Sequence, residues 1–168
     1  MDVDNFIRSF QLVLNDWGID HFKAPEFIKM RRLGRLAPPP DESLWANMHP
    51  TALMADSLRR HMNCPLIVGN GYRPKALNKQ VGGHPRSQHL HFRALDLDLT
   101  PGFYDFAEKF YRYAVQMHMS EMGKDMKMGL GLYSPVGGTR IHIDFGHRHR
   151  YWGGLWGKYY RDIARSMR

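Results

Sequence analysis

Apolar residues recur at helical spacing over the first third of the chain and alternate with polar residues in later segments. Phe6, Phe10, Leu14 and Trp17 share one helical face and are followed by Gly18, so this pattern predicts a helix that ends there. Three further helices are predicted at 24–32, 49–62 and 101–119, the last with an apolar stripe of Phe103, Phe106, Phe110 and Ala114.

Strand patterns appear in the second half of the chain. The apolar run in "CPLIVGN" predicts a buried strand, and in "RALDLDLT" the residues Ala94, Asp96 and Asp98 alternate with three leucines. The segments "MGLGLYS" and "TRIHIDF", joined by the turn "PVGG", predict a β-hairpin that places His142 and Asp144 on one face.

The order of these elements indicates the fold class. Helices come first, and several strands follow with one helix between them. This order favours an α+β fold, in which helices pack on a small, largely antiparallel sheet. The length of 168 residues suits one hydrophobic core, so we expect a single domain over 1–168.

Composition narrows the class of protein. Hydrophobic residues make up 43% of the chain and charged residues 24%, as in an ordinary globular protein, and no stretch approaches the roughly 20 apolar residues of a membrane span. The start "MDVDNFIRSF" lacks the features of a secretory signal peptide, so we expect synthesis in a cytoplasm. The single cysteine, Cys64, excludes an intramolecular disulfide and a cysteine-only metal site.

The formal net charge of +8 favours a polyanionic partner, such as nucleic acid, anionic lipid or a cell-wall polymer. The basic residues are scattered, and their densest cluster is near the C-terminus, where a solvated basic face is the simpler interpretation. No nucleic-acid recognition motif is readable, so nucleic acid is not expected as a partner.

Two aspartates on one buried strand need compensation, because burying unpaired carboxylates is costly. If the strand with Asp96 and Asp98 neighbours the strand with His142 and Asp144, these four side chains converge. A divalent cation would resolve the repulsion, and so would protonated or paired groups. Catalytic zinc takes three His or carboxylate ligands, which His89, Asp96 and His142 would supply, although a strand histidine is also common as a hydrogen-bonded structural residue.

The longest motif runs over 71–99, "GYRPKALNKQVGGHPRSQHLHFRALDLDL", and contains Ser87-x-His89 and Ala94-x-Asp96. Farther along come "GLGLY" and "IHID", the second of which contains His142 and Asp144. In this order, the motifs resemble those of the zinc D-alanyl-D-alanine carboxypeptidase family, which includes phage L-alanyl-D-glutamate endopeptidases. The resemblance covers about 22–152.

This resemblance implies a hedgehog/DD-peptidase-like fold and Zn²⁺ as the cofactor. The implied ligands are His89, Asp96 and His142. Arg73 would engage a substrate carboxylate or the scissile carbonyl oxygen, a role that suits a planar guanidinium group. Asp144 would be the general base or a group that orients a ligand, and Ser87 would line the substrate pocket.

Some positions depart from the family pattern. Phe92 stands where the family has a glycine, which would demand a negative φ or backbone strain. Thr139 stands where some relatives carry a catalytic Glu, so the base is assigned to Asp144. Asn70 replaces a serine. An alternative ligand pair lies in "HRHR", at His147 and His149.

The expected function is therefore that of a zinc metallopeptidase, an endopeptidase or DD-carboxypeptidase, which hydrolyses peptide bonds in peptidoglycan stem peptides. A short wall hydrolase made in the host cytoplasm fits a phage endolysin or a virion component, with virion proteins as further candidate partners. The alternative is a structural or wall-binding module that keeps the peptidase fold without turnover, an interpretation motivated by Phe92 and by the missing Glu.

Overall fold

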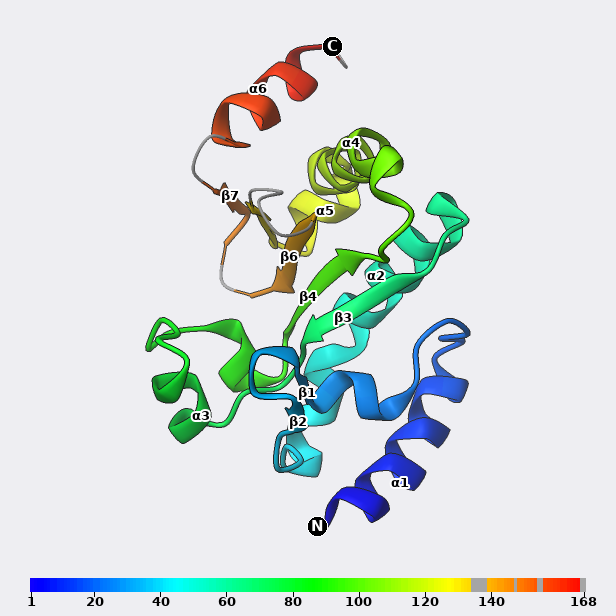
Figure 1. Ribbon diagram of the computed structural model, residues 1–168, viewed down its shortest axis with the longest axis vertical. Coiled ribbons are helices and arrows are strands. Elements are labelled where there is room, and N and C mark those ends of the chain that lie inside the picture. Colours follow the sequence, from blue (N-terminus) through cyan, green and yellow to red (C-terminus); the bar gives the residue numbers. More distant parts are fainter. Residues whose placement is uncertain (134–138, 147, 154–155, 167–168) are drawn as a thin grey trace.

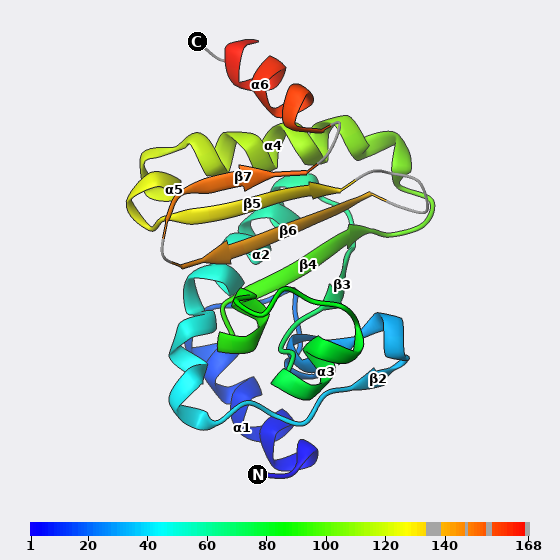
Figure 2. The same cartoon turned by 90° about the vertical axis from the view of Figure 1, so that its left-hand side faces the viewer.

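The computed structural model describes residues 1–133, 139–146, 148–153 and 156–166, with the side chains of 156–159 left aside. In these parts, seven strands form one sheet in the order β2-β1-β3-β4-β6-β5-β7 (Figures 1 and 2). The strands are β1 (Lys29–Met30), β2 (Arg35–Leu36), β3 (Leu66–Asn70), β4 (Ala94–Leu99), β5 (Met128–Tyr133), β6 (Arg140–Phe145) and β7 (Arg150–Trp152). All pairings are antiparallel except that of β5 with β7.

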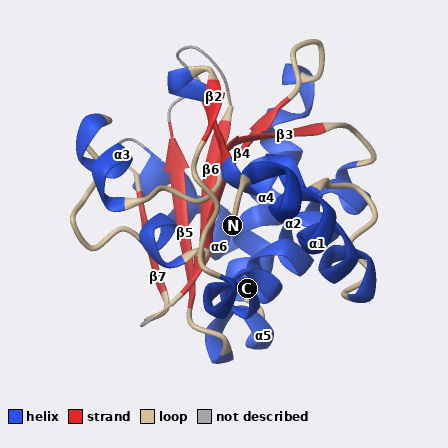
Figure 3. Ribbon diagram, turned by 90° about the horizontal axis from the view of Figure 1, so that it is seen from below, coloured by secondary structure: helices blue, strands red, loops and turns tan. Residues whose placement is uncertain are grey.

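The helices pack mainly on one face of this sheet. They are α1 (Val3–Asp16), α2 (His49–Met62), α3 (Lys75–Gln80), α4 (Ala107–Met119), α5 (Glu121–Asp125) and α6 (Trp156–Ser166). Figure 3 shows α1, α2 and α4 on one side of the sheet and α3 on the other. The mixed α+β class with a largely antiparallel sheet is thus confirmed. None of the described helices is long and apolar enough to cross a membrane.

The central strand β4 divides its side chains between two environments. Leu95, Leu97 and Leu99 belong to the hydrophobic core, and the alternation of the strand places Asp96 and Asp98 on the opposite face. Both aspartates are nevertheless buried. That opposite face therefore carries the polar chemistry, between the sheet and the segment that contains α3.

The strands β4 and β6 bring the polar residues into register. Asp96 lies directly opposite His142, and Asp98 lies opposite Arg140. Side chains directly opposite each other on neighbouring strands have Cβ atoms about 4.5–5.5 Å apart, which is close enough for direct contact. The expected convergence of Asp96 and His142 follows from this register.

The segment 24–32 differs from the predicted helix. It forms a short 3₁₀ helix, η1 (Ala24–Ile28), followed by β1, which pairs with β3. The amide of Tyr72 donates to the Phe27 carbonyl oxygen at 2.7 Å, so backbone pairing with the neighbouring strand replaces helical bonds here. β7 and α6 were not predicted either, and the expected turn at 135–138 lies outside the described residues.

Candidate metal centre

Three side chains place one potential ligand atom each around a single point. His89 lies on the 3₁₀ helix η4 (Gln88–His91), Asp96 on β4 and His142 on β6. His89 Nε2 lies 3.2 Å from both Asp96 Oδ1 and His142 Nδ1, and the last two atoms are 2.9 Å apart. All three residues are buried. Together they could hold a metal ion.

Each of the three residues uses its other polar atom for a fixed hydrogen bond. His89 Nδ1 donates to the Gly71 carbonyl oxygen at 2.7 Å, and His142 Nε2 donates to Asp144 Oδ2 at 2.9 Å. Asn70 Nδ2 donates to Asp96 Oδ2 at 2.8 Å. These bonds leave one potential ligand atom of each residue at the shared point, and bonds of this kind orient metal ligands in proteins.

The donor set fits zinc. Two imidazoles and one carboxylate are a common protein ligand set for catalytic zinc, with a fourth position open. Donors on one tetrahedral zinc at about 2.0–2.1 Å are about 3.3 Å from one another. The observed separations of 2.9–3.2 Å are only slightly shorter.

The close approach of these three side chains shifts their pKa values. Burial alone would raise the pKa of Asp96, but the imidazoles of His89 and His142 outweigh burial and hold that pKa well below its usual range. Burial would lower the pKa of His142, but hydrogen bonds to Asp144 and Asp96 raise it to about 9. The pKa of His89 is lowered, chiefly by burial. The cluster therefore favours an ionised carboxylate with a positive charge beside it.

Asp144 lies behind His142 and is fully buried. Its Oδ2 accepts hydrogen bonds from His142 Nε2 at 2.9 Å and from Arg150 Nη2 at 2.8 Å. Asp144 does not line the cleft described below. Of the two roles considered for this residue, the geometry favours orienting His142 over acting as a general base.

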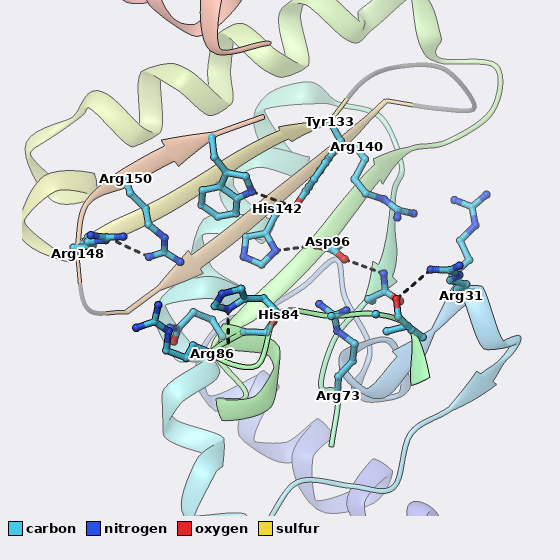
Figure 4. A pocket seen from close by; sticks show the side chains of 18 residues that line it. Arg31, Arg73, His84, Arg86, Asp96, Tyr133, Arg140, His142, Arg148 and Arg150 are labelled. Carbon is cyan, nitrogen blue, oxygen red and sulfur yellow. Dashed lines mark hydrogen bonds and ion pairs between the residues drawn. The ribbon is translucent and has the colours of Figure 1, made fainter. Parts of the chain in front are cut away.

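The candidate ligands lie beside an open cleft of about 1230 Å³, whose lining includes Asp96 and His142 (Figure 4). Among the described residues that line it, seven are arginines and Asp96 is the only carboxylate. Arg73 and Ser87 both line this cleft, as the sequence predicts for substrate-contacting residues. Within the described structure, the buried Nε of Arg73 has no hydrogen-bond partner.

Three contributors to the site were not predicted from the sequence. Asn70 and the Gly71 carbonyl hold two of the candidate ligands, and Arg150 holds Asp144. For these contributors, the sequence contained one signal, the amide side chain of Asn70 at a position where the family has serine. A side chain on Gly71 would collide with the Phe27 carbonyl, so the close approach of the two backbones requires glycine there.

The backbone of Phe92 lies in a region of φ and ψ that favours glycine. Its φ of 51° and ψ of 48° lie in the left-handed region, so of the two expected alternatives the structure has the strained one. The ring is fully buried and packs against Phe6, Phe10 and Tyr72. Burial of the ring offsets the strain at this turn.

The alternative ligand pair gains no support. His147 lies outside the described residues, and His149 Nε2 donates to the His118 carbonyl oxygen at 2.7 Å. Within the described chain, His89, Asp96 and His142 form the one group of three His, Cys, Asp or Glu residues with suitable ligand spacing.

Two comparisons with known proteins bear on the candidate site. A search of curated proteins found no match. The family model Peptidase M15 matches residues 21–129, which include Arg73, His89 and Asp96 but end before His142. The match spans more than half of the chain. The chain therefore belongs to the Peptidase M15 family of zinc-dependent metallopeptidases.

Proposed function

We propose that this protein hydrolyses peptide bonds in the stem peptides of peptidoglycan, with His89, Asp96 and His142 as its zinc ligands. The observation that carries the proposal is the convergence of three donor atoms at 2.9–3.2 Å, each with its far side held by a hydrogen bond. The resemblance to phage endopeptidases further suggests a role in phage lysis or in the virion.

Zinc, when bound, supplies a Lewis acid and an activated water as nucleophile at neutral pH. The protein supplies orientation. Arg73 faces the same cleft with an unpartnered Nε among the described residues, and it binds the scissile carbonyl oxygen or a substrate carboxylate. Ser87 contacts the substrate from the edge of η4.

Asp144 is a positioning residue in this proposal. By accepting from His142 Nε2, it keeps the proton on that nitrogen and leaves Nδ1 free as a ligand. Arg150 balances the charge of Asp144 and fixes the carboxylate. Neither residue needs to touch the substrate for this role.

The test combines zinc analysis with hydrolysis of purified peptidoglycan, followed as the release of new amino groups. We expect about one zinc per chain and amino-group release that stops with a chelator and returns with added zinc. His142→Ala should lose both zinc and activity. His61→Ala, at an exposed position on α2, should retain both. Hydrolysis that persists in zinc-free protein would contradict the proposal.

A binding module without turnover is the second candidate. The observation in its favour is that Thr139 occupies the position of the family's Glu and Asp96 is the only carboxylate among the described cleft residues. In the same experiment, zinc binding and sedimentation with peptidoglycan sacculi, without any release of amino groups, would favour this candidate over the peptidase.

A further inference from the structure

Three arginines gather on one side of the candidate metal centre. Figure 4 shows Arg31, Arg73 and Arg140 beyond Asp96, and Arg148 and Arg150 on the other side of His142. The register explains the placement, because the pair Asp98–Arg140 lies two residues along the strands from the pair Asp96–His142. Two residues of a strand span about 7 Å, roughly the length of two residues of an extended peptide.

A buried carboxylate holds two of these arginines in place. Arg140 Nε and Nη2 donate to the two oxygens of Asp98 at 2.8 Å each, and Arg31 Nη1 donates to Asp98 Oδ2 at 2.9 Å. Gly69 leaves the necessary room, since a Cβ there would lie 2.8 Å from both Arg140 Nη2 and Asp98 Oδ2. The carboxylate therefore positions both guanidinium groups, while the Arg31 and Arg140 side chains remain 50% and 33% exposed.

The positive charge of this group exceeds its negative charge. Asp98 balances one of the three arginines. Arg73 has no ion pair in the described structure, and burial lowers the pKa of its guanidinium group. Asp96 and Tyr133 oppose this effect, and Arg140 adds a smaller lowering effect. Tyr133 lies near both guanidinium groups, and its hydroxyl oxygen is 3.3 Å from Trp152 Nε1. A partly buried guanidinium group without an ion-pair partner is costly, and an anion bound beside it would lower that cost.

We propose that Arg73 and Arg140, supported by Arg31 and Asp98, form a carboxylate-binding subsite about two residues away from the scissile bond. Among the described residues, Arg140 Nη1 and the Arg73 guanidinium group are not engaged by the Asp98 carboxylate, and a planar carboxylate can accept hydrogen bonds from two such donors. The cleft therefore selects stem peptides with free carboxylates over peptides in which these groups are amidated. This inference rests on the proposed function, because it names the substrate of the same cleft.

The test measures binding to chelator-treated protein, in which hydrolysis does not interfere. The probes are the tetrapeptide L-Ala-γ-D-Glu-L-Lys-D-Ala with both carboxyl groups free and the same peptide with both as primary amides. Titration calorimetry or NMR shifts give the two affinities. We expect the acid to bind the wild type at least about ten-fold more tightly, because charge-assisted hydrogen bonds contribute about 1.5–3 kcal/mol each, equivalent to about 10- to 150-fold.

Variants then locate the preference. Arg140→Gln should remove most of the acid preference, and Arg31→Gln, which leaves the Arg140–Asp98 pair intact, should reduce it about three-fold. Arg112→Gln is the matched control, because it removes one partly exposed arginine from α4, outside the cleft, and should leave the ratio unchanged. If Arg140→Gln does not fold, the acid preference of Arg31→Gln, compared with that of the wild type, tests the subsite.

The inference is overturned if acid and amide bind equally, if the acid shows no saturable binding up to about 10 mM, or if the ratio survives in the folded cleft variants. Its failure is separable from failure of the proposed function. If the protein hydrolyses peptidoglycan without preferring the acid, only the proposed subsite is contradicted. If it prefers the acid but does not hydrolyse peptidoglycan, only the proposed peptidase activity is contradicted.

Discussion

His142 and Asp144, two residues apart on β6, are joined by a hydrogen bond of 2.9 Å between Nε2 and Oδ2. The opposite ring nitrogen of His142 faces Asp96 Oδ1, also at 2.9 Å. The imidazole is thus held at both ends, with one nitrogen committed to a buried carboxylate and the other facing the candidate metal position. Zinc affinity should therefore depend on Asp144 as well as on the three candidate ligands.

Asp144→Asn should weaken zinc binding about 10- to 100-fold, because the amide cannot hold the His142 ring as the carboxylate does. Competition with a chromogenic chelator measures this affinity. At saturating zinc, much of the kcat should return. Asp56→Asn is the control, since it changes a buried, ion-paired aspartate on α2 that does not line the cleft. Unchanged zinc affinity with a lost kcat would instead make Asp144 the base.

Zinc should stabilise the folded protein, because its ligands converge only in the native state. At a free zinc concentration of about 100 times Kd, the free energy of unfolding should rise by about 2.7 kcal/mol, or about 5–10 °C in Tm. Thermal melts with and without chelator measure the shift. In His89→Ala the melts should coincide, and a zinc-dependent shift that persists in this variant would place the metal elsewhere.

Phe92→Gly should destabilise the protein in spite of relieving a left-handed backbone, because the buried ring contributes about 3–5 kcal/mol and the strain costs only about 1–2 kcal/mol. Phe92→Ala is the matched variant, since it loses the ring but keeps the strain. Urea unfolding should show Phe92→Gly to be about 1 kcal/mol more stable than Phe92→Ala. The reverse order would mean that φ at this position is not positive.

His118 should make stability depend on pH. This buried imidazole donates from Nε2 to the Arg150 carbonyl oxygen and accepts from the Tyr160 hydroxyl group. Burial together with His149 lowers its pKa to about 4, against smaller opposing effects of the Arg150 and Met128 backbone and of Asp144. The unfolded chain therefore binds this proton below about pH 6.5 while the folded protein does not, so stability falls as the pH drops from 6.5 towards 4.

Through His118, the free energy of unfolding should fall by about 2.5 kcal/mol between pH 7 and pH 4.5. Urea unfolding of metal-free protein at both pH values measures it. His118→Gln should show a smaller pH dependence than the wild type by about this amount, and His61→Gln, at an exposed position, should not. Equal pH dependence in all three proteins would refute the assigned pKa.

The core of the candidate site could be predicted because it depends on local patterns. Alternation on β4 and β6 put Asp96 and His142 on polar faces, and an antiparallel pairing of those strands was enough to bring them together. The α+β class followed from the order of elements in the same way. The apolar stripe of α4 was partly wrong, since Phe106 is 42% exposed in a 3₁₀ turn that precedes the helix, where the α-helical period does not apply.

The rest of the site depends on contacts that no local pattern contains. Arg31 reaches Asp98 across 67 positions of the chain, and Asn70 reaches Asp96 across a strand pair with an irregular register. The two-residue strand β1 forms because β3 offers an edge, not because its own sequence favours a strand. The conflict at Phe92 was visible in the sequence, but its resolution by an aromatic core was not.

The central claim is that His89, Asp96 and His142 bind one zinc ion. Crystals grown with zinc and measured at the zinc absorption edge test it most directly through anomalous scattering. We expect one strong peak, about 2.0–2.2 Å from His89 Nε2, Asp96 Oδ1 and His142 Nδ1. A fully occupied zinc peak at His118 and His149, or no peak between these three residues at saturating zinc, would contradict the account.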